Sequence, residues 1–222
     1  MSNQFKKEYI VVAQNASGRN MNVPLYRFIG QEPGPKVYIQ SSIHGAEVQG
    51  NVVIYHLIQL LKKMPIRGEV ILVPNCNPVG TNIKAGEYTL GRFDPVNGTN
   101  WNRGYFYDAS LIEDFAQTVQ NDEPISQIKQ RFRQQIKHIL FNIPHVILIP
   151  NKFAGALDEA TFCPWWTLQD LVSQKRQQDV DFGVEAFTLE MGSQEVINFS
   201  EGEYDANSIL SYLNGKGCLL QS

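Results

Sequence analysis

The chain has 222 residues, of which 43% are hydrophobic and 18% charged, and its formal net charge is −3. This is the composition of a folded chain with one sizeable core, and without a Lys/Arg-rich stripe it argues against nucleic acid as a partner. The sequence has no run of about 18 apolar residues, so it predicts no membrane span.

The cysteines and the N-terminus indicate the compartment. Three cysteines are widely spaced and odd in number, so they match neither a disulfide framework nor a zinc ribbon. The first residues, MSNQFKKEYIVV, contain no apolar segment of signal-peptide length. We therefore expect a cytoplasmic protein with a single domain over residues 1–222.

The first half of the chain alternates strand and helix patterns. Short strands are predicted at 8–13 and 23–29, on either side of a polar turn. Residues 36–40 and 69–73 are rich in branched side chains and bounded by Gly and Pro, which is typical of strands buried on both faces of a sheet. Between them, apolar side chains recur with helical period over 47–63.

A long polar segment, 75–108, separates the two halves. A loop of this length in a compact domain is functional or disordered, and its aromatic residues argue against disorder. The later predicted elements are helices at 110–121 and 124–141, a strand at 143–150, loop and helix at 158–179, a strand at 183–192 and a helix at 205–217. This order predicts an α/β fold with a mixed sheet and helices on both faces.

His44 and Glu47 lie three residues apart, where the strand at 36–40 hands over to the helix at 47–63. Ligands in α/β sheets collect beyond the carboxyl ends of strands, and Gly45 allows a sharp turn there. From the first helical turn, Glu47 can point back toward His44. A neutral imidazole and a carboxylate are two of the three protein ligands that a catalytic zinc often uses. The alternative is that both residues serve the start of the helix, Glu47 through the helix dipole and His44 as a cap.

Two further regions carry candidate chemistry. The long loop places six polar donors and acceptors within twelve residues, which suits an anionic substrate but also fits a solvated loop. Glu190 lies near the end of the predicted strand at 183–192, where it can be a general base or an outward-facing carboxylate. The loop residues are Arg92, Asp94, Asn97, Asn100, Asn102 and Arg103.

His56 falls on the opposite side of its helix from Glu47 and is expected to be packed or hydrogen-bonded.

Four segments in order resemble the succinylglutamate desuccinylase/aspartoacylase family, zinc-dependent relatives of the metallocarboxypeptidases. They are HGAE, VPNCNPVG, GRFDPVNGTNWNR and FTLEMG, and the resemblance runs from about residue 36 to 217. It implies a zinc-carboxypeptidase-like fold and hydrolysis of an N-acyl amino acid or a related small amide or ester.

The resemblance also implies residue roles. His44 and Glu47 would be the first two zinc ligands, and Asn102 and Arg103 would hold the carboxylate of a small anionic substrate. Arg92 would polarise the scissile carbonyl and stabilise the developing oxyanion. Glu190 would activate the zinc-bound water and later protonate the leaving amine.

The sequence departs from the family pattern where the third zinc ligand is expected. The family supplies a histidine in an Asp-Leu-His context, and this chain has no such tripeptide. The helix at 124–141 runs almost directly into the strand at 143–150, so we infer an internal shortening near 141–143. His145 and, less readily, His138 are the candidates to replace the missing ligand. We also expect no small C-terminal β domain.

Two functions of different classes follow. The first is a zinc-dependent deacylase, favoured by Glu190, Arg92 and the Asn102–Arg103 pair. The second is a non-catalytic relative that binds an anionic small molecule or a partner chain, favoured by the missing third histidine. The acyl group, the amino acid and the oligomeric state are not encoded in any pattern that we recognise.

Overall fold

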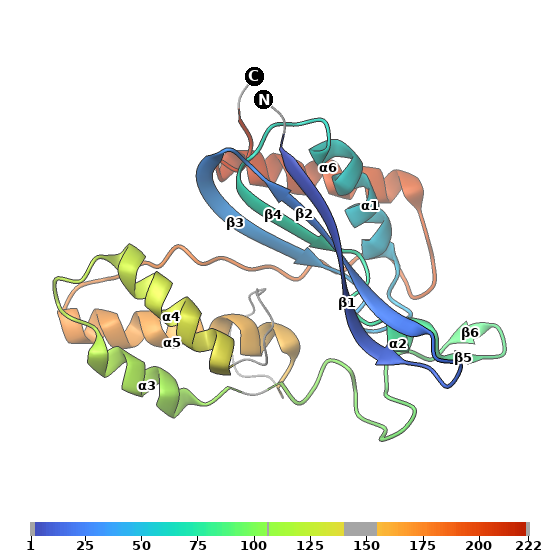
Figure 1. Cartoon of the computed structure of the whole chain (residues 1–222), viewed down its shortest axis with the longest axis horizontal. Helices are drawn as coiled ribbons and strands as arrows, with labels where there is room; N and C mark the ends of the chain where they lie inside the picture. Colours follow the sequence, from blue (N-terminus) through green and yellow to red (C-terminus); the bar gives the residue numbers. More distant parts are fainter. Residues whose placement is uncertain (1–2, 106, 140–154, 221–222) are drawn as a thin grey trace. The chain divides into compact units, whose positions relative to one another are not determined.

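In the computed structural model, the described residues are 3–105, 107–139 and 155–220. They fall into two compact units, which we call the sheet unit and the helical unit (Figure 1). The sheet unit comprises Met1–Trp101 with Glu190–Ser222, and the helical unit comprises Asn102–Leu189. No described helix is both long and apolar enough to cross a membrane.

The sheet unit is built on four strands in the order β1-β2-β4-β3. Strand β2 is antiparallel to both β1 and β4, whereas β3 and β4 are parallel and joined through helix α1. The predicted mixed α/β sheet is thus confirmed. The bounds are β1 Gln4–Gln14, β2 Asn20–Ile29, β3 Glu32–Gln40, α1 Gln49–Leu61 and β4 Arg67–Val73.

Alternation along β4 divides the apolar side chains between the two faces of the sheet. Val70 and Leu72 join the larger core, which α1 and α6 (Phe199–Gly215) cover together. Ile71 and Val73 point the other way, into a smaller cluster with residues of β2. Figure 1 shows α1 and α6 side by side against one face of the sheet. This core fixes the start of α1, next to which His44 and Glu47 lie.

The long loop of the sequence analysis contains short regular elements. Within it lie helix α2 (Pro78–Thr81) and a small hairpin of β5 (Lys84–Ala85) and β6 (Tyr88–Thr89). Asn77 caps α2, because its side-chain oxygen accepts from Gly80 N at 2.7 Å.

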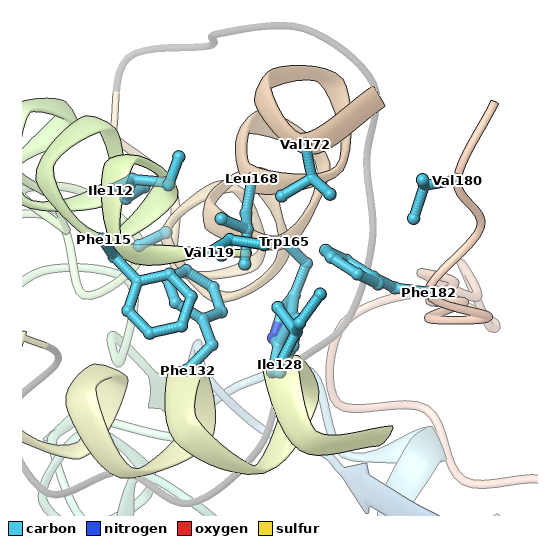
Figure 2. Close-up of a cluster of buried hydrophobic side chains, with 12 residues drawn as sticks. Ile112, Phe115, Val119, Ile128, Phe132, Trp165, Leu168, Val172, Val180 and Phe182 are labelled. Atoms are coloured by element: carbon cyan, nitrogen blue, oxygen red, sulfur yellow. The ribbon is translucent and has the colours of Figure 1, made fainter. Parts of the chain in front are cut away.

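The helical unit packs three helices around an aromatic core. Phe132 is fully buried, with its ring centroid 5.0 Å from that of Phe115 and 4.9 Å from that of Trp165 (Figure 2). The edge-to-face geometry at Trp165 is the arrangement that aromatic pairs prefer. The helices are α3 (Ala109–Thr118), α4 (Ile125–Ile139) and α5 (Leu157–Arg176).

Two predictions about local structure are wrong. Residues 183–192 form no strand: Phe187 and Leu189 are exposed, and Met191 packs against the larger core of the sheet unit. A strand needs a neighbouring backbone to pair with, and none of the described strands pairs with this segment. Glu47 lies before α1 rather than in its first turn. The predicted strand at 143–150 and the shortening near 141–143 lie outside the described residues.

Candidate functional site

His44 and Glu47 are brought together by a tight turn between β3 and α1. Glu47 N donates to His44 O at 3.1 Å, which closes the turn. In the same turn, His44 Nδ1 lies 2.9 Å from Glu47 Oε1. Helix α1 is capped at Val48 with no side-chain cap hydrogen bond, and its first turn contains no acidic residue. The capping alternative is therefore wrong, because the two side chains face each other instead of the helix end.

Arg92 contacts the same carboxylate oxygen. Its Nη2 donates to Glu47 Oε1 at 2.9 Å, so this oxygen faces both an imidazole and a guanidinium. The hydrogen bond with His44, followed by the charges of His44 and Arg92, lowers the pKa of Glu47 against the opposing effect of burial. Glu47 is consequently an ionised carboxylate at neutral pH.

Asn100 completes the surroundings of the buried His44 imidazole, with its Oδ1 2.9 Å from His44 Nε2. Each ring nitrogen thus faces an oxygen, and a carboxylate oxygen can only accept a hydrogen bond. A metal ion at the Nδ1 edge would contact both His44 and Glu47. Metal-binding histidines are commonly oriented in this way, by an oxygen that binds the other ring nitrogen.

One hairpin supplies both Arg92 and Asn100. Phe93 and Asn100 form an antiparallel bridge, and Trp101 N donates to Arg92 O at 3.1 Å. Asp94 closes the connection by accepting from Val96 N at 2.7 Å. The sequence indicated a donor-rich loop but assigned Asn100 no role. The turn residues Asp94-Pro95 and Asn97-Gly98 were the available signal for this hairpin.

Three glycines hold the turn and the hairpin against helix α2. Gly45 N donates to Gly91 O at 2.8 Å, so the residue that follows His44 is bonded directly to the residue that precedes Arg92. A Cβ on Gly45 would lie 2.1 Å from Gly80 C, and one on Gly91 would lie 2.3 Å from Gly80 O. Backbones can approach this closely only without side chains.

Glu190 belongs to the same unit but has no described contact with His44 or Glu47. It is exposed, and it lies just before Met191, which packs into the larger core of the sheet unit. Gly192 lies beside Gln49 at the start of α1, so that a Cβ added to this glycine would be 3.5 Å from the Gln49 side chain. The segment after Glu190 is therefore anchored close to the His44–Glu47 turn.

Asn102 and Arg103 belong to the helical unit. Asn102 Oδ1 accepts from Leu157 N at 2.8 Å and so binds the first residue of α5. Arg103 is exposed, and its Nη1 donates to Asn102 O at 2.6 Å. The structure thus gives Asn102 a structural contact with a residue 55 positions away, which sequence reasoning missed.

As a metal site, the described residues offer two donors. His44 and Glu47 converge, and the oxygen of Asn100 on the far ring nitrogen suits this role. Among the residues that the structure describes, no group of three His, Cys, Asp or Glu side chains can hold a metal. His145 lies outside the described residues, and so does the side chain of His138 in α4. His56 is packed as predicted, with its ring edge-on to Tyr55 and Phe199.

Comparison with known proteins identifies relatives of this chain. The model of the succinylglutamate desuccinylase/aspartoacylase catalytic domain matches residues 33–143. A solved protein from Shewanella frigidimarina, described as a succinylglutamate desuccinylase/aspartoacylase, is 33% identical with a TM-score of 0.86 over all of this chain and 74% of that one. No curated protein matches.

Two other solved structures extend the comparison. A succinylglutamate desuccinylase/aspartoacylase family protein from Shewanella amazonensis is 34% identical, with a TM-score of 0.80 over 98% of this chain and 74% of that one. The ectoine utilization protein EutE (DoeB) from Ruegeria pomeroyi is 15% identical, with a TM-score of 0.56 over all of this chain and 70% of that one. The latter likeness concerns the fold alone.

Proposed function

Because the chain belongs to the succinylglutamate desuccinylase/aspartoacylase family, we propose that it is a zinc-dependent deacylase of N-acyl amino acids or related small amides and esters. The observation that carries the proposal is the convergence of three side chains on one point. Glu47 Oε1 lies 2.9 Å from both His44 Nδ1 and Arg92 Nη2, and the buried imidazole is oriented from behind by Asn100.

His44 and Glu47 would hold the zinc ion. Zinc, when bound, supplies the Lewis acidity that makes water a nucleophile near neutral pH. Asn100 keeps the Nδ1 edge of the His44 ring turned toward Glu47, because it binds the opposite nitrogen. Arg92 lends a positive charge at the same place and remains 43% exposed, so its other N–H groups are accessible to a substrate oxygen.

The remaining roles belong to Arg103 and Glu190, which are exposed, and to Asn102, which is half-buried. Arg103 presents the planar fork that pairs with a carboxylate, and Asn102 would support it, so a small anionic substrate is the partner proposed. Glu190 would take a proton from the attacking water on its carboxylate oxygen and return it to the leaving amine. Removing the Arg103 guanidinium should chiefly raise KM, because the substrate carboxylate would lose its positive hydrogen-bond partner.

Zinc titration of the metal-free protein tests the site. We expect near-stoichiometric zinc for the wild type and loss of that zinc in His44→Ala. The matched control is His56→Ala, which removes an imidazole that packs on Tyr55 and Phe199 away from the turn. Equal zinc binding by the wild type and His44→Ala would contradict the assignment.

Hydrolysis of N-acetyl and N-succinyl amino acids tests the reaction. We expect Glu190→Gln to lower kcat by about 10²–10⁴-fold, the usual contribution of a general base. Its zinc content should not change. Glu203→Gln, on the exposed side of α6, is the control. Full activity of Glu190→Gln would contradict the role of this carboxylate.

A second candidate function is binding of an anionic small molecule without turnover. It is favoured by the finding that the described residues supply two metal donors rather than three, because a two-ligand site holds zinc less tightly. A wild type that binds N-acyl amino acids but neither retains zinc nor hydrolyses them would select this function over the deacylase.

A further inference from the structure

Glu195 bonds to two other segments of the sheet unit. Its backbone N donates to Ala46 O at 2.8 Å, inside the His44–Glu47 turn. Its side-chain Oε1 accepts from Thr89 N at 2.7 Å and lies 4.0 Å from Lys84 Nζ, on the β5–β6 hairpin. One residue therefore joins the turn, the hairpin and the segment that follows Glu190.

Each joined segment carries a residue of the proposed site or leads directly into one. Ala46 lies between His44 and Glu47, and Thr89 precedes Arg92 by three residues. Glu190 lies five residues before Glu195 on the same segment. Between Glu190 and α6, this segment has a second anchor at Asn198, whose N and O are both bonded to the buried Gln49 side chain at 2.9 Å.

The backbone of Glu195 adopts an unfavourable conformation to make these bonds. Its φ is +61°, in the left-handed region that non-glycine residues rarely enter. Such a conformation persists only where surrounding contacts hold it. Hydrogen bonds from Thr89 lower the pKa of Glu195, so its carboxylate is ionised at neutral pH and attracts the Lys84 ammonium.

We propose that Glu195 is a positioning residue, which fixes the Glu190 segment and the β5–β6 hairpin, three residues before Arg92, against the turn that carries His44 and Glu47. The inference rests on the proposed deacylase function, since positioning has meaning only for a reaction. Without the Glu195 carboxylate, the segment from Glu190 onward keeps the packing of Met191, the Asn198–Gln49 bonds and the Glu195 N–H bond. The β5–β6 hairpin, which leads into Arg92, then loses its tie to that segment.

Three variants separate positioning from folding. Glu195→Ala removes the acceptor of the Thr89 N–H, whereas Glu195→Gln keeps an oxygen at this place and loses only the charge. Glu87→Ala is the matched control, because this exposed carboxylate lies at the tip of the same hairpin and makes no hydrogen bond or ion pair with any residue that the structure describes.

We expect Glu195→Ala to lower kcat by about 10–100-fold, as small displacements of reacting groups do. Its KM should change by less than about threefold, because the contacts that bind the substrate equally in the ground state and the transition state are kept. Its zinc content should not change. Glu195→Gln should recover most of kcat, and Glu87→Ala should equal the wild type. The inference is overturned if Glu195→Ala keeps full kcat, or if Glu195→Gln is as impaired as Glu195→Ala.

Hydrogen exchange of the metal-free proteins gives a readout independent of turnover. In Glu195→Ala, the amides of 84–92 and 190–198 should exchange at least about tenfold faster than in the wild type. The reason is that the lost contact makes local opening of these segments easier. Glu195→Gln should stay close to the wild type. Absence of hydrolytic activity in the wild type would contradict the proposed function. Amide exchange rates in Glu195→Ala equal to those of the wild type would contradict the positioning role.

Discussion

Replacing Gly45 by alanine should loosen the whole site, because the glycine lies where three segments cross. The added Cβ would lie 2.1 Å from Gly80 C and 2.3 Å from both Gly80 O and Thr81 N. All three are backbone atoms, which cannot swing aside as the end of a side chain can. The turn must move away from α2, and the bond of 2.8 Å from Gly45 N to Gly91 O is strained or lost with it.

The expected cost follows from these contacts. Forcing a methyl group into a packed region costs about 1–3 kcal/mol, and a lost hydrogen bond adds about 0.5–1.5 kcal/mol. The stiffer unfolded chain of the alanine variant offsets about 0.4–1 kcal/mol. The net loss in free energy of unfolding is therefore about 0.5–4 kcal/mol, with a weaker hold of the Arg92 hairpin on His44 and Glu47.

Urea unfolding followed by fluorescence measures this loss, since Trp101 ends the hairpin in the same unit. Gly215→Ala is the matched control, because a Cβ there meets nothing within 4 Å at the end of α6. It should be neutral or stabilising by up to about 1 kcal/mol. An unfolding midpoint of Gly45→Ala equal to that of the wild type would refute the close-approach argument.

Three further predictions concern packing and caps. Phe132→Ala should cost about 3–5 kcal/mol in urea unfolding, because it empties the aromatic core of the helical unit. Gln49→Ala should cost about 1–3 kcal/mol in the same assay, because Asn198 N and O lose their partner. Bonds from Ser110 hold the pKa of Asp108 below its ordinary 3.8, so its stabilisation of α3 is present above that pH and lost as pH falls through the lower folded value. Asp108→Asn should therefore flatten the acid limb of a stability–pH curve, and an unchanged limb would show that the cap is not linked to protonation.

Local patterns predicted much of the sheet unit and the existence of the helices. Branched residues at 36–40 and 69–73 lie in β3 and β4, and the helical period over 47–63 corresponds to α1 at Gln49–Leu61. These predictions succeed because the apolar pattern of each segment reflects its burial against a neighbouring layer. The strand predicted at 183–192 fails because alternation does not supply a partner strand, and pairing is a non-local property.

In the candidate site, too, contacts between residues close in sequence could be predicted and contacts between distant residues could not. The His44–Glu47 contact spans three residues and is readable as a turn, whereas the contacts of Glu47 with Arg92 and of His44 with Asn100 span 45 and 56 residues. No local pattern encodes such distances, so the residue types of the loop indicated chemistry without indicating partners. The substrate role of Asn102 stays a prediction, and the contact of its side chain with the start of α5 is likewise one that no local pattern encodes.

Departures from ordinary folding preferences gather around the His44–Glu47 turn. A buried imidazole lies there, three glycines cross without room for a side chain, and Ser42 and Glu195 adopt positive φ. Among the described residues only one other non-glycine residue, Gln177, does so. An apolar, relaxed turn would join β3 to α1 at lower cost. Strain and buried polarity persist where the surrounding contacts enforce them, and they cluster at functional sites. The gathering of these features at one turn therefore supports the proposal that the arrangement serves the chemistry of the protein.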